Sequence, residues 1–277
     1  MTEPESHMCA KLYAKILTQV EGGILKDAER VKDEWWLTGL PTMGTNRYDI
    51  HLFRRGESTC HPLFWQMAQA ARDMADRLNK RQKASHVRLL LATNGLNFSA
   101  DTLPRYEMFD FLNVSWTPDI DEFLLKELLK GHSKEIQVSL VRTTQSDAVI
   151  KQFKKKWLDL GADRVRIYAM HSQDGKPGSL PSCIRPRKPC VKPFMEMLIN
   201  AGGQVSRCNH DFLSPQNGTT MGNANDNTIE EIWNGEKLNE LRRQQQTLEI
   251  TDPVCKECAS WYPGDGEQGT GEVEDGE

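Results

Sequence analysis

The chain has 277 residues, of which 38% are hydrophobic, and this is enough for one large packed domain with a smaller one beside it. Its 35 basic and 39 acidic side chains leave a net charge of −4, which argues against a general attraction to nucleic acid. No stretch approaches about 18 uninterrupted apolar residues, and the first residues do not have the pattern of a secretory signal. We therefore expect no membrane segment and a location in the cytoplasm.

Helices and strands are expected to alternate over the first part of the chain. Apolar residues at helical spacing predict helices over 9–20 and 26–37. Strands are then expected at 48–53, 87–92, 111–115, 136–141 and 164–170. Helices are expected between them at 63–79, 121–130 and 147–160. This order predicts βαβ units in a parallel sheet, whose ligands bind beyond the carboxyl ends of the strands.

The composition changes at 173–189, where four prolines, two glycines and four basic residues indicate a linker. We therefore expect one domain over 1–172 and a second over 190–262. In the second domain, 194–199 and 204–207 form a predicted hairpin around a pair of glycines, and a helix is expected over 228–245 with Asn227 or Thr228 as its N-cap. The acidic, glycine-rich end at 263–277 is predicted to be disordered.

Four of the seven cysteines are candidate metal ligands, since a chain without an export signal keeps its thiols reduced. Cys190, Cys208, Cys255 and Cys258 are separated by 17, 46 and 2 residues. The CxxC pair places two sulfurs on one tight turn, and the other two complete a four-thiolate cage, which suits zinc or an iron–sulfur cluster. Spacing alone favours zinc, and inert buried cysteines are a third reading. The alternative zinc ligands are Cys183, His171 and His210.

Three segments of the second domain carry a family resemblance. In order, they are CVKPFMEMLINAGGQVSRCNHDF, MGNANDNTIEEIWNGEKLNELRR and CKEC. They resemble the auxiliary-cluster domain, of the SPASM or shorter twitch type, of radical S-adenosylmethionine (SAM) enzymes, over nearly all of residues 190–262. The resemblance implies one auxiliary 4Fe-4S cluster on the four cysteines and so favours iron–sulfur over zinc. For the first domain it implies a partial (β/α)6 barrel that lacks its first strand.

The barrel half carries weaker resemblances. The segment RGESTCHP is similar to the GGEP loop of radical SAM barrels, in which Glu57 would accept a hydrogen bond from the methionyl ammonium of SAM. The loop departs from that pattern at Arg55 and Ser58. LLLATNG, NVSWTPD and VSLVRTT are similar to later strands of the barrel. They imply that Thr93 lies at the SAM site, that Ser115 contacts the ribose, and that Arg142 meets the carboxylate or the ribose.

The radical chemistry of this family also needs a CxxxCxxC loop, which these residues do not contain. Two interpretations stay open. In the first, the loop lies upstream of Met1, and the intact protein is a radical SAM/SPASM oxidoreductase or maturase. A 5′-deoxyadenosyl radical would then abstract hydrogen from a small molecule or peptide, with flavodoxin or ferredoxin as electron donor. In the second, the chain is a cluster-bearing pseudoenzyme or adaptor. Either way, we do not expect this polypeptide alone to cleave SAM reductively.

Overall fold

The computed structural model describes residues 7–34, 46–53, 56–81, 85–169, 187–209, 211 and 220–258. The chain divides into two compact units: a sheet unit of residues 9–139 and 151–165, and a second unit of residues 1–8, 140–150 and 166–277. The predicted tail at 263–277 and all but the last three residues of the predicted linker lie outside the described residues. The domain limits drawn from the sequence therefore stay predictions.

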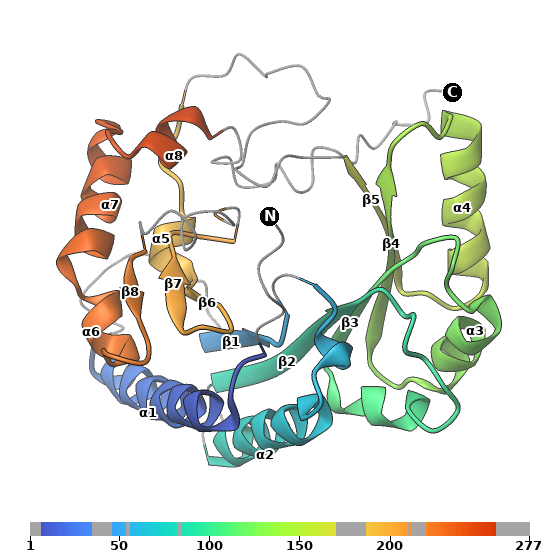
Figure 1. The fold of residues 1–277 in the computed structure, drawn as a ribbon, viewed down its shortest axis with the longest axis horizontal. Coiled ribbons are helices and arrows are strands. Elements are labelled where there is room, and N and C mark those ends of the chain that lie inside the picture. The colour runs from blue at the N-terminus through green and yellow to red at the C-terminus, as the bar shows by residue number, and fades with distance from the viewer. Residues whose placement is uncertain are drawn as a thin grey trace. The chain divides into compact units, whose positions relative to one another are not determined.

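Five strands form one sheet in which each strand pairs with its neighbour in sequence (Figure 1). They are β1 (Asn46–His51), β2 (Ser85–Thr93), β3 (Phe111–Ser115), β4 (Glu135–Arg142) and β5 (Arg164–Ala169). The pairs from β1 to β4 are parallel. The predicted α/β class with a parallel sheet is confirmed, and the five predicted strands are present within a few residues of their expected bounds.

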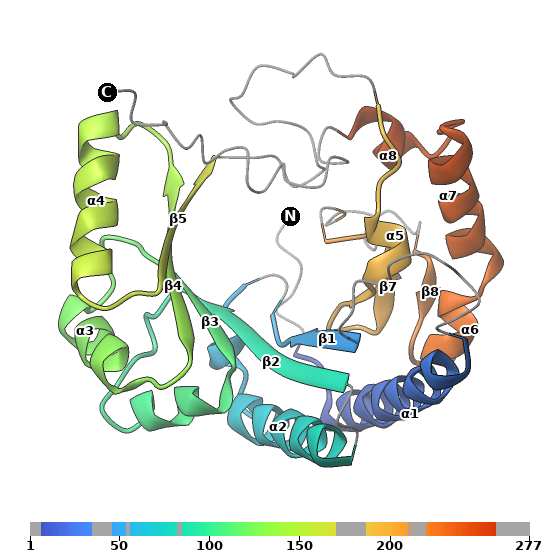
Figure 2. The ribbon, with the colours of Figure 1, turned by 180° about the vertical axis from the view of Figure 1, so that it is seen from behind.

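The helices of this part are α1 (Ala10–Glu34), α2 (Phe64–Arg81), α3 (Glu122–Gly131) and α4 (Asp147–Asp159), with short 3-10 turns at Ser58–Cys60 and Leu103–Met108. Figure 2 shows α2 and α3 along one face of the sheet. The core between these helices and the sheet is apolar. Its fully buried side chains include Leu91, Leu112, Val138, Leu125 and Trp157. Alternate strand residues supply it, because successive side chains of a strand point to opposite faces.

One expectation about the N-terminal helices is wrong. Two helices over 9–20 and 26–37 are predicted, whereas α1 runs without a break from Ala10 to Glu34. The buried face of the helix continues through the gap, because Val20 and Ile24 stand four residues apart and pack into the same cluster against α2. Gly22 and Gly23 lie opposite open space, so nothing in the packing forces the helix to end there.

The described residues from 187 onward form a three-stranded antiparallel sheet and four short helices. They are α5 (Lys192–Met195), β6 (Leu198–Ile199), β7 (Gln204–Ser206), β8 (Gly222–Asn223), α6 (Ile229–Trp233), α7 (Glu236–Thr247) and α8 (Pro253–Glu257). The predicted hairpin is confirmed as β6 and β7, although its first expected residues belong to α5. The strand β8, which pairs with β7, was not predicted.

The helix expected over 228–245 is two helices. Thr228 caps α6 as predicted, and its hydroxyl accepts a hydrogen bond from the backbone of Glu231 in a capping box. Gly235 then takes an extended conformation and begins α7. A side chain at this glycine would approach the carbonyl oxygen of Glu231 to 2.9 Å, so the turn requires glycine.

A small core joins the elements of the second unit. Val205 of β7, Ile232 of α6, and Leu238 and Leu241 of α7 are buried together, and the partly buried Cys255 packs against them. The CxxC helix α8 is thus attached to the only apolar cluster found among the described residues of this unit. None of the helices in the described part of the chain is long and apolar enough to cross a membrane.

Candidate functional site

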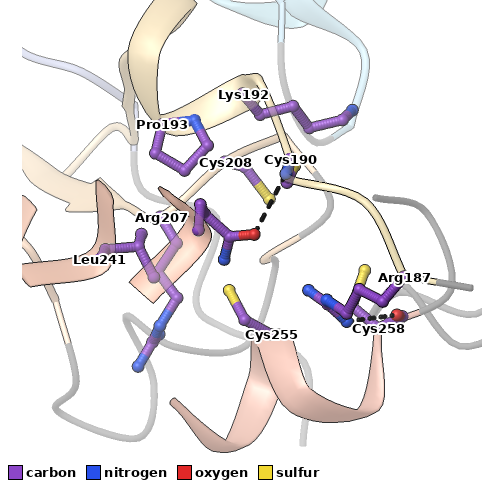
Figure 3. A pocket seen from close by; sticks show the side chains of 10 residues that line it. Arg187, Cys190, Lys192, Pro193, Arg207, Cys208, Leu241, Cys255 and Cys258 are labelled. Atoms are coloured by element: carbon purple, nitrogen blue, oxygen red, sulfur yellow. Dashed lines mark hydrogen bonds between the residues drawn. The ribbon is translucent and has the colours of Figure 1, made fainter. Parts of the chain in front are cut away.

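The four predicted metal ligands line one pocket of the second unit (Figure 3). Cys190 precedes α5, Cys208 follows β7, Cys255 lies in α8, and Cys258 ends that helix. None of the four forms a disulfide bond, and all four are partly buried. No three acidic, histidine or cysteine side chains in the described ranges gather as the ligands of a single metal ion would. The four thiols thus share one pocket without the close grouping of a single-ion site.

The CxxC helix is held by an N-terminal cap. Asp252 Oδ1 accepts hydrogen bonds from the backbone N–H groups of Val254, at 3.1 Å, and Cys255, at 3.0 Å. The turn before it is fixed by Gln244, whose Oε1 accepts from the N–H groups of Thr251 and Asp252. The position of Cys255 is thus set by the backbone of α8 and by a buried side chain of α7.

A buried arginine joins the strand that precedes Cys208 to this helix. Arg207 is 5% exposed, and its Nε donates to Asp252 Oδ2 at 2.7 Å. Its Nη1 donates to Asp211 Oδ2 at 3.1 Å, and Asp211 is itself buried. Burial opposes the charge, but the two carboxylates hold the pKa of Arg207 above its ordinary value. One side chain thereby ties together two cysteines that are distant in sequence.

Burial raises the pKa of the Cys255 thiol well above its ordinary value, and the negative charges of Asp252 and Cys208 add to the effect. Burial likewise raises the pKa of Cys190, although Lys192 opposes it. Thiolates in such a place cost free energy unless a positive centre takes the place of their protons. Without a bound metal, these two cysteines therefore favour the protonated thiol over the thiolate.

Gln245 lines the same pocket and was missed by the sequence analysis. It is fully buried, and its Oε1 accepts a hydrogen bond from the N–H of Cys190 at 3.1 Å, drawn as the dashed line at Cys190 in Figure 3. Its Nε2 is buried without a partner among the described residues. A pocket with four thiols and an unused N–H donor fits a sulfur-rich group. The sequence did contain an indication that Gln245 is buried. It follows Leu238 and Leu241 by seven and four residues, which places it on the buried face of the helix.

In the sheet unit, the structure brings together two of the predicted SAM-binding residues. Glu57 Oε1 accepts from the hydroxyl of Thr93 at 3.0 Å, and its Oε2 accepts from the N–H of Asn94 at 2.7 Å. The same carboxylate accepts from the backbone and hydroxyl of Thr59. Glu57 therefore fastens the loop after β1 to the end of β2. Contact with an ammonium group would come in addition to these bonds, and this role stays a prediction.

Ser115 ends β3 on the face of the sheet that turns away from the helices. Its register partner is Ser139 of β4, and two residues earlier on the same strands Gln137 Nε2 donates to Asn113 Oδ1 at 3.0 Å. This polar row was not predicted. Strands of parallel sheets are usually apolar on both faces. The alternating polar residues in FLNVS and EIQVSL therefore indicated one polar face in the sequence itself. The ribose contact of Ser115 stays a prediction.

Arg142 is placed differently. It is the last residue of β4, an even number of residues after Ile136 and Val138, which face the helices. Its guanidinium donates to the Gln145 carbonyl at 3.1 Å and to Asp147 Oδ1 at 2.7 Å. The cofactor role of Arg142 stays a prediction, and it would require the side chain to leave these local partners.

Residues 190–259 match the family model described as SPASM, an iron–sulfur cluster-binding domain. This segment is similar to SPASM domains, and the likeness favours an iron–sulfur cluster over zinc as the group that the four cysteines hold. No curated protein matches this sequence.

Several solved structures share the fold of the chain at low identity. BtrN in complex with AdoMet and 2-DOIA is 14% identical with a TM-score of 0.55, over 94% of this chain and 86% of BtrN. Streptococcus suis SuiB bound to precursor peptide SuiA is 13% identical with a TM-score of 0.56, over 88% and 63%. Histidine-tagged anSMEcpe with bound AdoMet is 14% identical with a TM-score of 0.55, over 91% and 74%. The expected likeness to radical SAM enzymes with a SPASM domain is confirmed for this domain and for the fold.

Proposed function

We propose that the SPASM domain holds one 4Fe-4S cluster through Cys190, Cys208, Cys255 and Cys258, and that the cluster passes single electrons. The single observation behind this proposal is that the four thiols line one pocket within the segment that matches the family. With a thiolate for each of the four irons, no iron is open to a substrate, which favours electron transfer over substrate binding. The surrounding hydrogen bonds of Arg207, Asp252 and Gln245 keep the ligands in place.

We further propose that the sheet unit binds SAM at the edge formed by the loop after β1 and the ends of β2 and β3. Solved structures of the same fold contain AdoMet, which supports this assignment. Glu57 would orient the loop through Thr93 and Asn94, and Ser115 lies at the end of the adjacent strand. The intact protein would act as a radical SAM/SPASM oxidoreductase or maturase on a small molecule or a peptide, with a flavodoxin or ferredoxin as electron donor.

A second function is a cluster-bearing electron carrier or adaptor that does not cleave SAM. One observation favours it for these 277 residues, since they contain no CxxxCxxC sequence. Anaerobic incubation of the reconstituted chain with SAM and dithionite tests whether these 277 residues generate the radical by themselves. We expect neither methionine nor 5′-deoxyadenosine above the level without protein. Stoichiometric formation of both would show that this chain generates the radical and would exclude the carrier.

The cluster itself is tested by anaerobic iron and sulfide analysis, with EPR after reduction. We expect about four irons and four sulfides per chain, and their loss when Cys255 and Cys258 are both replaced by alanine. A chain with Cys9→Ala and Cys60→Ala is the matched control, because these two thiols are exposed and lie outside the pocket. Zinc without sulfide would overturn the proposal and leave a structural metal domain.

A further inference from the structure

Two adjacent glutamines of α7 are buried but are used differently. Both the oxygen and the nitrogen of the Gln244 amide form hydrogen bonds within the protein. Its Oε1 accepts from the backbone of Thr251 and Asp252, and its Nε2 donates to Glu240 at 3.0 Å. Gln245 is fully buried, and only its oxygen is used, by the N–H of Cys190. Its Nε2 has no partner in the part of the chain that the structure describes.

The orientation of the Gln245 amide follows from its partner. The backbone N–H of Cys190 can only donate a hydrogen bond, so the atom that faces it has to be the amide oxygen. A flip of the amide would set two donors against each other. The two N–H groups on Nε2 are therefore turned away from the Cys190 backbone, in a side chain that lines the pocket of the four thiols.

Buried donors without an acceptor are rare in folded proteins, because no hydrogen bond offsets the free energy lost when the donor is removed from water. Leucine or methionine could occupy this position beside Leu241 without that cost, so the buried amide points to an acceptor within the pocket. Among the described side chains that line the pocket beside Gln245, only the four cysteines carry acceptor atoms, and a bound cluster would add its sulfides. Hydrogen bonds to these sulfurs are among the factors that set the potential of an iron–sulfur cluster.

We propose that Gln245 is a positioning residue for the auxiliary cluster: its Oε1 holds the backbone of Cys190, and its Nε2 donates a hydrogen bond to a sulfur of the cluster or of its ligands. This inference rests on the proposed cluster. Because the reduced cluster carries more negative charge, the donated hydrogen bond stabilises the reduced form and raises the reduction potential.

The test is an EPR-monitored redox titration of the reconstituted full chain, with iron and sulfide measured on each sample. The variants are Gln245→Met and, as matched control, Gln246→Met, which makes the same change at an exposed position of the same helix. We expect Gln245→Met to favour the oxidised form about tenfold, a fall of about 59 mV for one electron, with no shift in the control. An unchanged midpoint with about four irons present would overturn the inference. A wild-type chain without iron and sulfide would instead overturn the proposed cluster.

A second measurement needs no variant and decides the question if Gln245→Met loses its cluster. Glutamine labelled with 15N only at the side-chain amide is incorporated, and the reduced wild-type protein is measured by pulsed EPR. Gln245 is the one glutamine among the residues that line the pocket in the described ranges, so a 15N coupling is attributable to it. Its absence in a sample with a full cluster would overturn the inference.

Discussion

Replacing Asp252 should loosen the cysteine cage without touching a cysteine. In Asp252→Ala, α8 loses the cap on the N–H groups of Val254 and Cys255, which costs about 1 kcal/mol. Arg207 also loses its 2.7 Å partner while it stays buried, which costs about 2 kcal/mol more, since Asp211 still pairs with it. Together, about 3 kcal/mol corresponds to roughly a hundredfold rise in the population in which the CxxC helix is detached.

Release of iron to a chelator from the reconstituted protein, followed by its visible absorbance, measures this opening. We expect wild type to release iron most slowly, Asp252→Asn next and Asp252→Ala fastest. Asparagine keeps the capping oxygen but gives up the charge that faces Arg207. Asp121→Ala is the matched control, because it removes an equivalent cap from α3 in the sheet unit. Equal rates for Asp252→Ala and either wild type or this control would refute the reasoning.

Three further variants test the five-stranded sheet and its loops. Glu57→Ala should lower the free energy of unfolding by about 2 kcal/mol and expose the loop after β1 to limited proteolysis, because Thr93 and Asn94 lose their common acceptor; an unaltered cleavage pattern would contradict this. Trp157→Ala should cost about 3–5 kcal/mol in urea unfolding, since the indole is fully buried; a loss under about 1 kcal/mol would show that the site collapses. Arg142→Ala should cost less than about 1 kcal/mol in the same assay, because its ion pair is exposed; a larger loss would assign Arg142 a structural role.

The parts of the protein that the sequence predicted correctly depend on short-range patterns. The strand at 111–115 and the Thr228 cap each follow from a few neighbouring residues, and the structure reproduces both. The four cysteines were chosen from seven because two stand in CxxC and because the surrounding segment resembles a known domain, and their role as metal ligands stays a prediction. Where the local pattern predicted a helix end, packing decided otherwise. Val20 and Ile24 pack into one cluster, and α1 stays helical across Gly22 and Gly23.

The sequence alone determined which residue types were available for a metal site, because spacing and composition are properties of the chain. Only the tertiary structure decided which atoms remained unused. Residues distant in sequence meet at the cysteines: Arg207 reaches Asp252, and Gln245 reaches Cys190. Whether a buried amide is satisfied depends on every atom within hydrogen-bonding distance, and those atoms are set by the packing of α7 and α8 around the pocket. For this physical reason the donor on Gln245 could be recognised only in three dimensions.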